Sequence, residues 1–315
     1  MEPVVVVTNG VRIFGKDYSP QLLPIFRKVQ ESFDLPVFAI KQKTGNDEVE
    51  VLKDRIILRL KEDAPEDVVA HELMHVVLQT EGYPRVFYIS TVPRASEIYK
   101  LMASSFDHLI INDRCSEYGY DARAGFISHA ASYDSILNIP LPEDNPDAKC
   151  IAVSLLLHQL IKFDYYFGDP KAEHAFLDRF PLITPYWNRL SVAIQTFKKN
   201  PTPKKMWDLV EVHNMVLDQV ANDLHASVKI SKFVGFGPVL VSSEDKTNSA
   251  DSLFAETSQD LGNGQILLRT CLKKSKILVN VVLVASSDMK LISNDLRLPI
   301  VEYATKRGIE IRVLK

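Results

Sequence analysis

The sequence predicts three parts: an α+β domain over residues 1–120, an all-α region over residues 121–226, and a small α/β domain over residues 227–315. Three observations support this division. Short β-branched runs alternate with helical segments at the start, helical patterns without strands fill the middle, and continuous apolar runs return near the end. With 315 residues, 46% of them hydrophobic, the chain can bury the cores that these parts require.

The first part is expected to contain short strands and one amphipathic helix. The expected elements are strands over 4–7, 11–14 and 37–40, a turn at Asn9-Gly10, a helix over 20–33, and a hairpin over 49–60. The second strand of that hairpin, residues 55–60, comes directly before the next helix. If it lies at the edge of its sheet, its free backbone groups can hold an extended peptide by strand addition.

Residues 66–81 are predicted to form a buried helix. Asp63 and Glu66 have the spacing of a capping box, and Gly82 followed by Pro84 is a helix stop. Valine and leucine occupy most positions between these signals. The helix is therefore expected in the core rather than on the surface.

Inside this helix the sequence reads His71-Glu72-Leu73-Met74-His75. Histidines four residues apart lie on one helical face, where both imidazoles can bind one metal ion. Glu72 lies beside that face and can act as general base on a metal-bound water without being a ligand. Burying three such groups without partners costs several kcal/mol, which favours a metal site. The alternative is a chance pattern satisfied by ordinary core hydrogen bonds.

Two imidazoles leave a zinc ion short of the three protein ligands that catalytic sites usually have. A long helix over residues 94–118, ended at Gly119, is expected to follow and to supply the third. His108 is the first candidate, with Glu97 and Asp113 as alternatives. Glu97 and His108 are separated by about 16 Å of helix, so they cannot bind the same ion. Three polar residues of this helix can orient an imidazole from behind: Asn112, Asp113 and Glu117.

After a turn-rich stretch over 120–145, the middle region is expected to contain four helices. They are predicted over 146–167 with a stop at Gly168, and over 170–179, 185–199 and 203–226. Thr-Pro pairs at 184–185 and 202–203 are typical of helix starts. The histidines of this region lack pair spacing and are interpreted as structural or exposed: His158, His174, His213 and His225.

The last part is predicted as a three-layer α/β domain with a parallel sheet that binds or senses a ligand. Its expected elements are strands over 238–242, 277–285 and 308–314, a mostly helical stretch over 250–274 with a break at 262–264, and a helix within 288–306. Residues 266–315 contain ten Lys or Arg against four Asp or Glu, a local charge of +6. This surplus leaves nucleic acid open as a partner, although solvated helix faces explain it as well.

The whole chain has a net charge of -3, which gives no general argument for nucleic acid or membrane binding. Cys115, Cys150 and Cys271 are widely spaced and form no Cys-x-x-Cys pair, so a reducing cytoplasm is expected. The N-terminus has no basic region before its short apolar run, and no signal peptide is predicted. The apolar stretch over 150–167 contains charged residues and is expected to be a buried helix, not a membrane span.

The order of a strand over 55–60 and the segment Val69–Leu78 resembles the zincin class of metallopeptidases. Within that class it is similar to the ImmA/IrrE-type regulatory peptidases, and the resemblance covers about residues 35–118. It implies that His71 and His75 bind zinc and that Glu72 is the catalytic base. Members of the group often use a glutamate from a following helix as third ligand, and this sequence has no clear acidic match.

The function expected from these observations is that of a cytoplasmic zinc-dependent metallopeptidase that cleaves a specific protein substrate. Its predicted metal ligands are His71, His75 and His108, with Glu72 as general base. The alternative is a regulatory or nucleic-acid-binding protein in which the zinc site is structural. A peptidase-derived scaffold without turnover is a third option.

Overall fold

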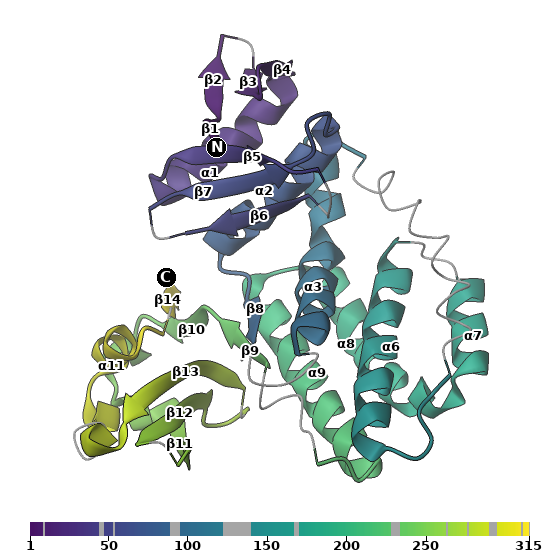
Figure 1. The fold of residues 1–315 in the computed structure, drawn as a ribbon, viewed down its shortest axis with the longest axis vertical. Coiled ribbons are helices and arrows are strands. Elements are labelled where there is room, and N and C mark those ends of the chain that lie inside the picture. The colour runs from purple at the N-terminus through teal and green to yellow at the C-terminus, as the bar shows by residue number, and fades with distance from the viewer. Residues whose placement is uncertain are drawn as a thin grey trace. The chain divides into compact units, whose positions relative to one another are not determined.

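The structure is a computed structural model of the chain (Figure 1). It describes all residues except 9, 44–46, 53, 89–94, 122–139, 167–169, 228–233, 263, 276, 290–294, 310 and 315. Side chains at 87–88, 95–104, 162–166, 170–172 and 312–314 are also outside the description.

The chain divides into two compact units. The first contains residues 1–81, 106–139 and 164–168, and the second contains residues 82–105, 140–163 and 169–315. Most of the predicted middle region and the whole predicted C-terminal domain thus belong to the second unit. The long helix α3 (Ala95–Glu117) contributes residues to both units.

A four-stranded sheet in the first unit has the order β1 (Glu2–Pro3), β5 (Val37–Lys41), β7 (Ile56–Leu60), β6 (Glu48–Val51). β7 pairs with β5 in parallel and with β6 antiparallel. Residues 55–60 therefore form an interior strand, and the condition for strand addition to them, a position at the sheet edge, is not met. The run of apolar residues in β7 fits an interior strand of the sheet, and β1 and β6 form its two edges.

The other elements of this unit follow the predicted order. A second sheet contains β2 (Val5–Val7), β3 (Gly10–Ile13) and β4 (Lys16–Tyr18). A single 3-10 turn at Pro20–Leu22 leads into α1 (Leu23–Phe33), which packs against α2 (Glu66–Glu81). The turn predicted at Asn9-Gly10 includes Asn9, which lies outside the described residues.

The helix predicted over residues 66–81 is confirmed as α2, and most of its length is buried. Its first turn is held by Glu66, whose carboxylate accepts hydrogen bonds from the Ser19 hydroxyl and backbone amide and from the Tyr120 hydroxyl at 2.6 Å. These bonds tie the start of α2 to segments before α1 and after α3. The helix therefore has a fixed position within the first unit.

The second unit contains the four helices that the sequence predicts, with ends that differ by a few residues. They are α6 (Pro146–Tyr166), α7 (Pro170–Arg179), α8 (Thr184–Lys198) and α9 (Pro203–Asp223). The Thr202 hydroxyl accepts a hydrogen bond from the Lys205 amide, as expected for a helix cap. Gly168 and most of the stretch 120–145 lie outside the described residues.

The sheet of the second unit differs from the predicted parallel one. Its order is β11 (Phe254–Asp260), β12 (Gln265–Leu272), β13 (Leu278–Ala285), β9 (Val234–Gly237), β8 (Arg85–Tyr88). Three of its four pairings are antiparallel. β8 is also a strand that the sequence did not predict.

The helix predicted over 250–274 is wrong, because these residues form the hairpin β11–β12. Gly262 and Gly264 have φ of +76° and +77°, so the expected break within a helix is the turn of the hairpin. Parallel pairing occurs between β13 and β9 and between β10 (Val239–Ser242) and β14 (Ile311–Leu314). The helix expected within 288–306 is found as α11 (Ile300–Arg307).

All three cysteines are free thiols, and Cys115 and Cys150 are buried. Among the residues that the structure describes, no helix combines the length and the apolar character that a membrane span needs.

Candidate metal centre

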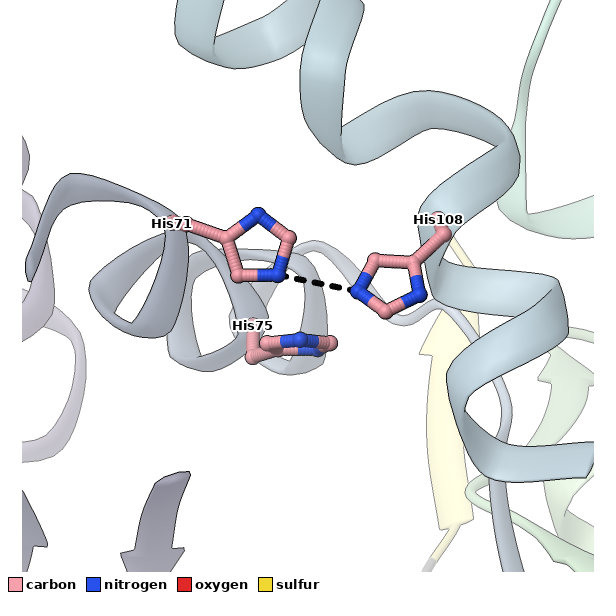
Figure 2. Close-up of side chains that lie close together, drawn as sticks. All are labelled: His71, His75 and His108. Atoms are coloured by element: carbon pink, nitrogen blue, oxygen red, sulfur yellow. Dashed lines mark hydrogen bonds between the residues drawn. The ribbon is translucent and has the colours of Figure 1, made fainter. Parts of the chain in front are cut away.

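Three histidines of the first unit meet at one point (Figure 2). His71 and His75 project from neighbouring turns of α2, and His108 projects toward them from α3. One ring nitrogen of each lies within 4.8 Å of the others. The ring centroids are 4.8 to 5.2 Å apart.

Local sequence explains why the rings converge. The four-residue spacing in α2 places His71 and His75 on one face. In α3 the neighbours of His108 are apolar and buried, including Phe106, Leu109 and Ile111. This apolar segment anchors α3 in the core of the first unit, so its one histidine reaches the face of α2. Burial of His71 and His108, each 6% exposed, keeps the site largely dry.

The Nε2 atoms of His71 and His108 are 2.9 Å apart. Two nitrogens bound to one tetrahedral zinc ion at about 2.0–2.1 Å would be separated by about 3.4 Å. The difference is about half an ångström, which small rotations of the two rings can supply. At 2.9 Å the two imidazoles are within hydrogen-bond distance, and both could bind one ion after that small rotation.

His75 has a carboxylate partner behind it. Its Nδ1 lies 2.9 Å from Oδ2 of Asp107, the residue before His108 on α3. This bond fixes the proton on Nδ1 and leaves Nε2 as the coordinating atom. Metal-binding histidines commonly have such a carboxylate on the other ring nitrogen.

The charge states of the histidines follow from their surroundings. Burial lowers the pKa of His71 well below its usual value, and the charge of His75 lowers it further, so His71 is a neutral imidazole. Burial also disfavours protonation of His75, but the hydrogen bond and charge of Asp107, together with Glu72, outweigh it and raise the pKa of His75. A metal ion must displace that proton to bind, so its affinity will depend on pH.

Glu72 is 8% exposed and lies one residue after His71. Burial raises its pKa to about 7, against the opposing charge of His75, and the carboxylates of Asp47 and Glu48 raise it further. A carboxylate with this pKa can take up and release a proton near neutral pH. That is the property required of a general base.

The alternative third ligands do not join this group. Among described side chains, the candidate ligand group contains three histidines only. Asp113 is exposed, because five residues after His108 it lies on a different face of α3. The Glu97 side chain lies outside the described residues.

Of the residues expected to orient an imidazole, Asp113 and Glu117 are exposed and Asn112 is buried. Glu117 lies 3.3 Å from Arg114. Asp107, which the sequence pattern did not single out, is the carboxylate that contacts His75. The only local signal for it was an acidic residue next to a candidate ligand in an apolar helix.

The histidines of the helical region are consistent with a structural interpretation. His158 and His213 are buried on α6 and α9 with their Nε2 atoms 2.8 Å apart, and Nδ1 of His158 donates to the Ser154 carbonyl at 2.6 Å. His174 is exposed.

Comparisons with known protein families, with curated proteins and with solved structures found no match for this chain. What the site can do is therefore argued from its own geometry. The buried group of His71, His75 and His108 can bind a metal ion.

Proposed function

We propose that the protein is a zinc-dependent peptidase of the zincin class that cleaves a protein substrate. The observation that carries this proposal is the meeting of three imidazoles from α2 and α3, with the buried Glu72 next to His71 in the sequence of α2. The motif His71-Glu72-Leu73-Met74-His75 supports it, since that spacing joins two ligands and a base on one helix.

The donor set fits zinc. Three imidazoles with buried, largely dry surroundings are typical ligands of this ion, and three protein ligands characterise catalytic sites, whereas structural sites usually have four. The contact between Asp107 and His75 adds the outer support that zinc-bound histidines usually have. When bound, zinc would act as a Lewis acid toward a water molecule and the scissile carbonyl.

Glu72 would perform the proton transfers. It takes one proton from the attacking water, whose oxygen bonds to the carbonyl carbon of the peptide. It then delivers that proton to the departing nitrogen as the carbon–nitrogen bond breaks, so the products are a carboxyl group and an amine. A carboxyl group suits both steps, because it can accept and then donate the same proton.

The sheet edge offers a place for the substrate. β6 is one of the two edge strands of its sheet and lies next to α2 (Figure 1). An extended peptide that pairs with β6 gains backbone hydrogen bonds and lies along the helix that carries Glu72. β7 cannot pair with a substrate in this way, because β5 and β6 already pair with it on both sides.

The test compares Glu72→Gln with the wild-type protein. The variant should keep one zinc ion per chain, measured by elemental analysis, and lose at least about a hundredfold in cleavage of an unfolded protein substrate. Glu31→Gln, at an exposed position on α1, is the matched control and should cleave normally. Cleavage that persists in Glu72→Gln would refute the mechanism.

The alternative of a nucleic-acid-binding protein receives less support from the structure. Two basic side chains near the C-terminus form ion pairs within the second unit. Lys306 contacts Asp295 at 2.6 Å, and Arg307 contacts Asp295 at 2.8 Å and Glu256 at 2.9 Å. These contacts reduce the charge available for phosphates. Salt-sensitive binding of nucleic acid by the full chain would favour the alternative.

A further inference from the structure

The edge strand β6 presents two carboxylates to solvent. Glu48 and Glu50 are exposed and lie two residues apart, so they share one face of the sheet. Arg59 of β7 contacts both, at 3.3 Å and 3.0 Å. One guanidinium neutralises only one of the two charges, and this face of β6 keeps a net charge of -1.

Asp47 adds to this negative charge. Its Oδ1 accepts a hydrogen bond at 2.7 Å from the backbone amide of Lys61, a neutral group. Together Asp47, Glu48, Glu50 and Arg59 carry three negative charges and one positive charge, a net of -2. We call these four residues the acidic edge.

The acidic edge lies on the strand next to the helix that carries Glu72. Asp47 and Glu48 both interact electrostatically with Glu72, and β6 contacts α2. A peptide that pairs with the edge strand β6 lies directly beside the exposed carboxylates of Glu48 and Glu50. The residues of such a peptide that flank the scissile bond will therefore meet negative potential.

We propose that the acidic edge selects extended peptide segments in which two Lys or Arg residues are separated by one residue. The inference rests on the proposed peptidase function and names the substrate class. Backbone pairing with β6 is independent of sequence, so the side chains must provide the selection. Side chains of a strand alternate between faces, so peptide residues two apart lie opposite Glu48 and Glu50.

The size of the preference follows from cross-strand charge pairs. Each opposite-charge pair changes affinity by about 1.4- to 5-fold, and two pairs by about two- to thirtyfold. Since the carboxylates are exposed, dissolved salt screens them, and about 1 M salt should remove most of the preference. A purely structural role of the acidic edge predicts no preference at any salt concentration.

Binding is measured with zinc-loaded Glu72→Gln, which keeps the site and stops turnover. Three fluorescent peptides of identical length differ only at two positions, which hold Lys and Lys, Gln and Gln, or Glu and Glu. Anisotropy titrations should rank their affinities in that order. Equal affinities at low salt would overturn the proposal.

Two sets of substitutions in this background act in opposite directions. Glu48→Gln with Glu50→Gln should remove the preference for the Lys peptide. Arg59→Gln should increase it, because both carboxylates then lack their internal cation. Glu31→Gln on α1 removes a distant exposed carboxylate and should change nothing. A preference that survives the double substitution, or that falls in Arg59→Gln, contradicts the proposal.

Different results would refute the peptidase function and the selection of basic peptides. Cleavage by the wild-type chain of all three peptides at equal rates keeps the peptidase function and refutes the selection of basic residues. Binding with the expected charge order and no cleavage by the zinc-loaded wild-type chain keeps the selective surface and refutes the peptidase.

Discussion

Asp107 distinguishes His75 from the other two histidines of the candidate metal centre. Its carboxylate lies 2.9 Å from Nδ1 of His75, and both side chains are less than one-fifth exposed. Because it contacts a ligand and not the ion, Asp107 is a positioning residue. It orients the ring and makes the coordinating nitrogen a better electron donor.

Asp107→Ala should therefore weaken zinc binding by about 10- to 100-fold, measured by competition with a chromophoric chelator. Asp107→Asn, which keeps an acceptor without the charge, should recover part of the loss. The matched control is Asp113→Asn on the exposed face of the same helix, which should bind zinc as the wild type does. Weaker binding in Asp113→Asn than in Asp107→Ala would show that the wrong carboxylate has been chosen.

The buried His213 should make the stability of the protein depend on pH. Burial lowers its pKa well below the usual value, and the charge of His158 lowers it further. The unfolded chain takes up a proton near pH 6.5 and the folded chain does not. The free energy of unfolding therefore keeps its full value above about pH 6.5. Below that pH it falls by at most about 1.4 kcal/mol per pH unit.

Urea unfolding between pH 7.5 and 5.5 tests this, with zinc-saturated protein so that the metal centre stays constant. His213→Gln should show a weaker loss of unfolding free energy toward acid pH than the wild type. His174→Gln removes an exposed histidine of the same region and should behave as the wild type. Parallel curves for the wild type and His213→Gln would exclude His213 as the titrating group.

The sequence predicts the part of the site that depends on local spacing. His71, Glu72 and His75 belong to one helix, and a helix of known pitch fixes their faces. His108 was selected because zinc needs a third ligand, and the structure brings it to the other two. Asp107 was not predictable in this way, since its role depends on how α3 is rotated against α2.

Among the elements, the end of α3 is determined by Gly119. This residue has φ of +81°, and a Cβ at this position would lie 2.3 Å from Nε2 of Gln21, which donates a hydrogen bond to the Tyr118 carbonyl. A left-handed residue with no side chain ends the helix, and the Gln21 side chain occupies the space above it. Sequence alone predicts this stop, because glycine is the usual residue there.

Gly119→Ala should therefore destabilise the protein by about 1–2 kcal/mol, the cost of the left-handed conformation, because the exposed Gln21 side chain can move aside. Gly15→Ala is the matched control, since Gly15 has φ of +78° and a Cβ added there would meet no atom within 4 Å. Chemical denaturation gives both values. The two losses should be similar. A much larger loss in Gly119→Ala, recovered by adding Gln21→Ala, would show that the Gln21 side chain cannot move aside.

Other elements show where sequence patterns fail. β7 was predicted correctly as a strand, but its interior position depends on β5, which pairs with it from a distant part of the sequence. In β12, Leu267 and Leu268 point to opposite faces of a sheet, and the same apolar run also fits a helix. The antiparallel partners β11 and β13 decide between the two structures, and neither pairing can be read from the run itself.

At the scale of the whole molecule, the chain leaves its first unit after residue 81 and returns at residue 106. The sequence predicts contiguous domains because composition changes are read along the chain. The grouping of separate segments depends on contacts between residues far apart in sequence, and these have no local signature. The helix content was therefore predictable, whereas the division into two units was not.

The division into two units determines where zinc should stabilise the chain. All three candidate ligands belong to the first unit, so zinc should stabilise that unit in particular. A ligand that binds only the folded state at 100 times its Kd contributes about 2.7 kcal/mol. Amide hydrogen exchange should slow by up to about a hundredfold in α2 and in residues 106–117 when zinc is added, and stay unchanged in α8 and α9. His75→Ala should remove the effect. Equal slowing in α8, α9 and α2 would show that zinc acts elsewhere in the chain.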